Sequence, residues 1–128
     1  MKGDDIARRL RRFAAQVLRL CRKLPRDSSC RHVGLQLVRA ASSGGSNYEE
    51  ARGAESRADF IHKLSIATKE LRESLYWLEL AQEAELFDIR VDDLIREANE
   101  LVAILTSSVK TAKYRAQEKE PAGCPVRQ

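Results

Sequence analysis

Apolar residues recur along most of the chain at steps of three and four, the spacing of one face of an α-helix. In the first run they stand at Ile6, Leu10, Phe13, Val17, Leu20 or Cys21, and Leu24. Asp4 and Asp5 suit the start of this helix and Pro25 ends it. With three later runs, the pattern predicts helices at about 4–24, 28–51, 56–85 and 92–116.

The stretch SSGGSNYEE, residues 42–50, has the composition of a flexible linker. However, small and apolar positions keep their helical phase through it, from Leu37 through Ala41 and Gly44 to Tyr48. Each glycine inside a helix costs about 1 kcal/mol relative to alanine, so a helix here requires close packing against a neighbour. We therefore expect a helix, with a Gly/Ser loop as the alternative on local composition.

A better break lies at residues 52–55, where Gly53 suits the position just past a helix end. Ser56 to Asp59 then has the form of a capping box that opens the third helix. Four amphipathic helices with short connections predict an all-α, antiparallel up-down-up-down four-helix bundle over residues 1–117. The polar, proline-containing segment 118–128 is expected to be a disordered tail.

Composition narrows the class of protein. Cys21, Cys30 and Cys124 have no C-x-x-C spacing and no apolar leader precedes them, which predicts a cytoplasmic chain with reduced thiols and no metal site. The longest uncharged apolar runs are well short of the roughly 20 residues that span a membrane. We expect no membrane partner and no cofactor.

Positive charge is concentrated in the first quarter of the chain. Residues 1–26 contain nine Lys or Arg against two Asp, whereas the whole chain has a net charge of +4. The candidate nucleic-acid ligands are Arg8, Arg9, Arg11, Arg12, Arg19, Arg22, Lys23 and Arg26. Arginine forks pair with phosphate oxygens, and no aromatic residues are interleaved for base stacking, so binding would depend on charge and shape. The alternatives are a solvated face or, less favoured, an anionic membrane surface.

The third helix carries apolar residues beside its core stripe, at Tyr76, Trp77 and Leu80. Aromatic residues are enriched in subunit interfaces, which makes these three the candidate oligomer contact and a closed homo-oligomer its simplest partner. The alternative is that Trp77 fills one edge of the core.

Two spacings fit the R-x(4–6)-H motif of some all-helical ribonucleases, Arg57 with His62 and Arg26 with His32. In such a site Arg and His would handle phosphate and proton transfer. With so many arginines such spacings arise readily by chance, and we expect the protein not to be an enzyme.

Residues 37–87 contain a series of short motifs: Arg39-Ala40-Ala41, Asn47, Glu50, the region from Arg52 to Ser56, Asp59-Phe60 and Glu70-Leu71. In this order the motifs resemble the bacterial four-helix-bundle family of 23S ribosomal-RNA intervening-sequence proteins. The second helix departs from the family pattern, which often ends in Glu-Gly, because here Glu50-Ala51 precedes a later Gly53. The resemblance implies a helical Gly/Ser stretch and a homopentamer. Related bundles are accessory subunits of diversity-generating retroelements, which implies a reverse transcriptase and nucleic acid as partners.

Three functional hypotheses follow. The first is a non-enzymatic homo-oligomer that binds structured RNA or DNA as part of a ribonucleoprotein. Its affinity for nucleic acid should fall steeply as the salt concentration rises. The second is a protein-interaction scaffold without nucleic-acid binding. The third is a ribonuclease that uses Arg57 and His62.

Overall fold

The computed structural model describes residues 2–118, which form four helices. They are α1 (Lys2–Arg22), α2 (Ser28–Arg52), α3 (Arg57–Glu83) and α4 (Asp92–Glu118). The predicted all-α fold is confirmed, and each helix lies within a few residues of its predicted range. Glu118 is the last residue of α4; the rest of the predicted tail and Cys124 lie outside the described residues.

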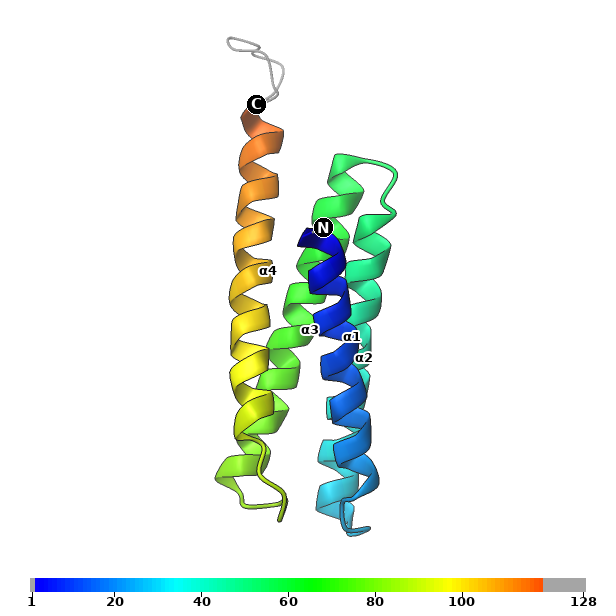
Figure 1. Cartoon of the computed structure of the whole chain (residues 1–128), viewed down its shortest axis with the longest axis vertical. Helices are drawn as coiled ribbons and strands as arrows, with labels where there is room; N and C mark the ends of the chain where they lie inside the picture. The colour runs from blue at the N-terminus through cyan, green and yellow to red at the C-terminus, as the bar shows by residue number, and fades with distance from the viewer. Residues whose placement is uncertain (1, 119–128) are drawn as a thin grey trace.

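Each helix packs against the next one along the chain, and α1 also contacts α4, which closes the bundle (Figure 1). Along the long axis, the C-terminal turns of α4 extend past the N-terminus of α1 (Figure 1). The contact between α1 and α4 is therefore confined to the part of α4 that α1 reaches. Within residues 2–118, no helix is long and apolar enough to cross a membrane.

The core is built from the apolar stripes that the sequence predicts, and all four helices contribute to it. Its largest fully buried side chains include Leu10 and Phe13 of α1, Leu37 of α2, Leu71 of α3 and Leu101 of α4. Burial of one such side chain contributes roughly 1.5–3 kcal/mol. On the opposite face of α1 the exposed residues are mainly arginines.

The Gly/Ser stretch is helical throughout, which confirms the prediction that it is not a linker. Gly44 is buried where α2 meets α3, and a Cβ atom added there would overlap Cδ2 of Leu71. Gly45 faces α1, where an added Cβ would lie 3.7 Å from Cβ of Leu10. Gly44 thus packs against α3 and Gly45 against α1, and of the two only Gly44 has no room for a side chain.

Helices α2 and α3 each begin at a side-chain cap. Asp27 caps α2 by accepting a hydrogen bond from the Cys30 amide at 2.9 Å, which lowers the pKa of the Asp27 carboxyl. Ser56 caps α3 in the same way, accepting from the Asp59 amide at 3.0 Å. Gly53 ends α2 with a φ of −99°, so it does not use the left-handed conformation.

The end of α3 was not anticipated. Glu85 has a φ of 53°, in the left-handed region that favours glycine. The amide of Leu86 donates to the Ala81 carbonyl and that of Glu85 to the Gln82 carbonyl, which together form a Schellman motif. Glu85 occupies the position that glycine usually holds, so the turn stores backbone strain.

Candidate nucleic-acid interface

Helix α1 presents the basic residues on the side away from its core stripe. Among the eight candidate ligands, six are exposed and have no carboxylate within ion-pair distance in residues 2–118. We call these six the basic face: Arg11, Arg12, Arg19 and Arg22 of α1 and, in the turn after it, Lys23 and Arg26. Their positive charge is therefore available to an anionic partner.

The other two candidates are paired within the bundle. Arg8 lies 3.2 Å from Asp5, one turn earlier on the same helix, and both side chains are exposed. Arg9 is held more firmly, because its Nε and Nη2 atoms donate to the two carboxylate oxygens of Glu97 at 3.0 and 2.8 Å. Its Nη2 atom also lies 2.6 Å from Glu100.

These hydrogen bonds, to Glu97 first and then to Glu100, raise the pKa of Arg9 above its ordinary value. Because both carboxylates belong to α4, the guanidinium joins the two helices that pack least extensively. Arg9 is thus occupied as a structural tie, although its place in the sequence is indistinguishable from that of its neighbours.

A shallow hollow of about 290 Å³ lies between α1 and the loop that precedes α4. It is lined by Arg19 and Lys23 of the basic face, by Gln16, and by Arg90 of the loop. Arg90 is partly offset by Asp92, whose Oδ2 lies 2.7 Å from Nη2, and this contact lowers the pKa of Asp92. Cations from two elements therefore converge beside the end of α1.

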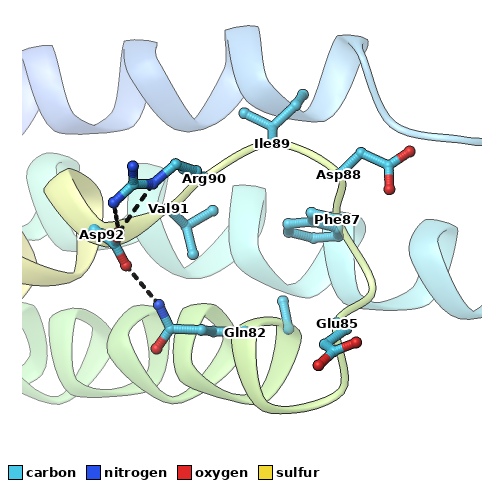
Figure 2. A pocket seen from close by; sticks show the side chains of 9 residues that line it. Gln82, Glu85, Phe87, Asp88, Ile89, Arg90, Val91 and Asp92 are labelled. Atoms are coloured by element: carbon cyan, nitrogen blue, oxygen red, sulfur yellow. Dashed lines mark hydrogen bonds and ion pairs between the residues drawn. The ribbon is translucent and has the colours of Figure 1, made fainter.

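A second cavity, of about 190 Å³, lies between the end of α3 and the loop that precedes α4 (Figure 2). Its polar side chains include Glu85, Asp88 and Asp92, and Gln82 donates a hydrogen bond to Asp92 at 2.7 Å. The apolar side chains of Phe87 and its neighbours fill much of its wall (Figure 2). Arg90 also lines this cavity, but the three carboxylates outweigh its charge and disfavour phosphate. The face of α1 remains the candidate anion surface.

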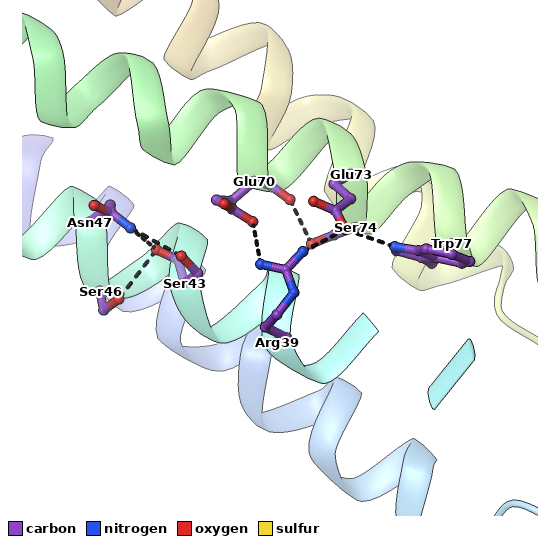
Figure 3. A network of polar contacts seen from close by, with 8 residues as sticks. All are labelled: Arg39, Ser43, Ser46, Asn47, Glu70, Glu73, Ser74 and Trp77. Carbon is purple, nitrogen blue, oxygen red and sulfur yellow. Dashed lines mark hydrogen bonds and ion pairs between the residues drawn. The ribbon is translucent and has the colours of Figure 1, made fainter. Parts of the chain in front are cut away.

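Trp77, one of the three residues of the predicted oligomer contact, belongs to a polar network between α2 and α3 (Figure 3). Trp77 donates its indole N–H to Glu73 at 3.0 Å, and Glu73 accepts from Arg39 of α2 at 2.5 Å. The bonds from Arg39 and then Trp77 lower the pKa of Glu73. The Trp77 ring also packs edge-on against His32 and Tyr76, with centroids 5.7 and 5.1 Å apart.

Trp77 is thus half-buried with its polar atom satisfied inside the chain. Tyr76, by contrast, is 55% exposed, and Leu80 is partly exposed one turn further along α3. Among the three predicted contact residues, Tyr76 is therefore the most exposed.

Comparison with known proteins identifies the family. The sequence model of the family described as 23S rRNA-intervening sequence protein matches residues 4–107. The chain belongs to this family. Its fold is also similar to a crystal structure of a protein of unknown function from the S23 ribosomal protein family of Bacteroides thetaiotaomicron. That match has a TM-score of 0.77 at 33% identity and covers 86% of this chain and 99% of the other. Comparison with curated proteins finds no match.

The ribonuclease alternative uses Arg57 and His62, which are both exposed on α3 of this intervening-sequence family member. Five residues along a helix correspond to a rotation of roughly 140° between side chains, so the two point to different sides. Within residues 2–118, no three His, Cys, Asp or Glu side chains gather as metal ligands.

Sequence reasoning missed one feature of this family member. Leu35 of α2 is 70% exposed and Leu18 of α1 is 46% exposed, the first being the most exposed large apolar residue in the described chain. A signal was present, because neither residue belongs to the core stripe of its helix. Leu18 and Leu35 are therefore exposed apolar residues of α1 and α2 that the predicted contact on α3 does not include.

Proposed function

We propose that the chain is a non-enzymatic, homo-oligomeric helical-bundle protein that binds structured RNA or DNA through the basic face. The observation that carries this proposal is the set of six exposed cations with no carboxylate partner, held on and just after one rigid helix. Solubility alone does not require unpaired charges to gather on one helix while Arg8 and Arg9 are neutralised.

The mode of recognition follows from the side chains. Phe13 is the only aromatic residue of α1, and it is buried in the core. Base stacking is therefore not offered by this helix, whereas guanidinium groups suit phosphate oxygens. We expect binding to follow backbone charge and shape, with little preference for base sequence.

Membership of the family supports the helical-bundle part of this proposal. The relation to accessory proteins of diversity-generating retroelements suggests a reverse transcriptase as protein partner and a pentamer as the assembly. Several copies of the basic face on one assembly would strengthen binding to an extended nucleic acid by raising the effective concentration of each further contact.

The test compares two variants that each remove four positive charges. One replaces Arg11, Arg12, Arg19 and Lys23 with Gln, and the matched control replaces Arg57, Lys69, Lys110 and Arg115. All eight side chains are exposed and form no ion pair within residues 2–118. Binding to a fluorescent RNA stem-loop and to a DNA duplex is measured by anisotropy over a series of salt concentrations.

Each phosphate contact that is lost lowers the slope of log affinity against log salt by about 0.9 on duplex DNA. In the variant of the basic face, most of the slope of log affinity against log salt should be lost, whereas the control variant should keep the wild-type slope. If both variants weaken binding equally, only net charge matters and the proposed site is wrong. If the wild type binds neither nucleic acid, the protein-interaction scaffold becomes the better hypothesis, which the exposed Leu18 and Leu35 favour.

A further inference from the structure

A groove lies between the C-terminal half of α1 and the N-terminal half of α2. Figure 1 shows the end of the bundle at which these two helices are joined. Its volume is about 670 Å³, and its apolar lining includes Cys21, Leu24, Leu35 and Val38. Leu18, three residues before Cys21 on α1, extends the same apolar strip. The groove is large enough to receive side chains of another helix.

The charged residues that line this groove are all arginines. They are Arg22, Arg26 and Arg31, and each is exposed without a carboxylate partner in the described part of the chain. A partner that brings acidic side chains around an apolar centre would therefore fit the groove in both shape and charge.

Such a surface is present on α3 of the same chain. Tyr76 and Leu80 form its apolar centre, and Glu79 and Glu83 each follow one of them by three residues, which places them beside it on the helix. Both glutamates are exposed, and neither forms an ion pair within residues 2–118. We call this the acidic α3 surface.

The groove and the acidic α3 surface lie at the same level along the bundle. The edge-on contact between His32 and Trp77 sets the residues around Tyr76 beside the first turns of α2. At those turns α2 also meets α1, where a Cβ added at Gly34 would lie 3.3 Å from Leu24. A neighbouring copy could thus dock laterally without sliding along the bundle axis.

We infer that the acidic α3 surface of one copy docks into the arginine-lined groove of the next copy, giving a head-to-tail assembly. The two surfaces are complementary to each other and not to themselves. If two grooves faced each other, Arg22, Arg26 and Arg31 would lie against the same arginines of the other copy. If two acidic α3 surfaces faced each other, carboxylates would lie against carboxylates. A repeated contact between two different surfaces forms a closed ring when its rotation closes.

This inference rests on the homo-oligomeric part of the proposed function and names the surfaces that form the contact. It also gives Tyr76 and Leu80 a defined partner. Tyrosine is enriched among residues that dominate binding energy, and here it would enter a groove with an apolar floor. Arg22 and Arg26 belong to both the basic face and the groove, so they are left unchanged in the test.

The test uses two single variants of the full-length chain, Leu35→Glu in the groove and Tyr76→Arg on α3. Both side chains are largely exposed, so the fold should persist, and far-ultraviolet circular dichroism checks it. Tyr114→Arg is the matched control, because Tyr114 is 62% exposed near the end of α4, away from both surfaces. Masses are measured by light scattering after size-exclusion chromatography.

We expect the wild type and Tyr114→Arg to be oligomeric and each of the two test variants to be monomeric. An equal mixture of Leu35→Glu and Tyr76→Arg should form a one-to-one dimer, since one intact surface of each kind remains. A monomeric wild type overturns the inference, as does a test variant that keeps the wild-type mass. Failure of the mixture to associate overturns the head-to-tail arrangement.

These outcomes are separable from the nucleic-acid proposal. A monomeric wild type that still binds RNA with a steep salt dependence would refute the ring and retain the basic face. An oligomer that behaves as expected but binds no nucleic acid would do the reverse.

Discussion

Gly44 and Gly45 are adjacent in α2, but replacing each one with alanine should affect stability differently. In a helix interior, alanine is favoured over glycine by about 1 kcal/mol. Gly45→Ala should keep this gain, because its Cβ meets Leu10 at an ordinary contact distance of 3.7 Å. We expect it to stabilise the folded chain by about 0.5–1 kcal/mol.

Gly44→Ala gains the same helix propensity but meets a different neighbour. The new Cβ would overlap Cδ2 of Leu71, and that side chain is fully buried, so it cannot swing into solvent. Overpacking of a core costs about 1–3 kcal/mol, which exceeds or offsets the gain in propensity. Gly44→Ala should therefore range from neutral to about 2 kcal/mol less stable than the wild type.

The assay is urea denaturation followed by circular dichroism at one fixed protein concentration, since self-association makes apparent stability depend on concentration. The midpoint should rise for Gly45→Ala and stay or fall for Gly44→Ala, with an unchanged slope. A second variant, Leu71→Ala, opens the space beside Gly44, so in that background Gly44→Ala should become stabilising. Equal stabilisation by both glycine variants would refute the close approach of α3 at Gly44.

Three further predictions concern single side chains. Arg9→Gln should destabilise the bundle by about 1 kcal/mol in urea denaturation because its bidentate tie to α4 is lost. It should leave the salt slope of RNA binding unchanged, and a clear fall in that slope would contradict its structural role. The pKa of Glu73 is lowered in the folded chain, so ionised Glu73 should stabilise the fold at any pH above the ordinary pKa of glutamate. This stabilisation should be lost as the pH falls through the lowered pKa. The fluorescence of Trp77, the single tryptophan, should change over that acidic interval in the wild type but not in Glu73→Gln. Glu85→Gly should stabilise the chain by about 1 kcal/mol by relieving the left-handed strain, and a lower thermal midpoint would count against it.

The helices were predictable because their signals are local. Apolar spacing places the core stripe on each helix, and Asp27 and Ser56 mark the starts of α2 and α3. Even the Gly/Ser stretch could be assigned, since its small residues at Gly44 and Ala41 stay in phase with the stripe.

The candidate site was less predictable because it depends on the register between helices. The apolar spacing shows that Arg9 lies outside the core stripe of α1. Its pairing with Glu97 depends on how α1 and α4 are aligned, which the spacing does not show. The bond from Trp77 to Glu73 likewise depends on Arg39 arriving from α2. Glu85 gives no sequence signal at all, since glutamate is uncommon in the left-handed region.

The overhang of α4 beyond the N-terminus of α1 has a practical consequence (Figure 1). Its final turns have packing neighbours on fewer sides than the middle of the bundle, so their amide protons should exchange with deuterated solvent before those of the other helices. A dye attached near Tyr114 would stand at the far end from the junction of α1 and α2. A label at this position would allow single-molecule measurements without altering the groove between α1 and α2 or the acidic α3 surface.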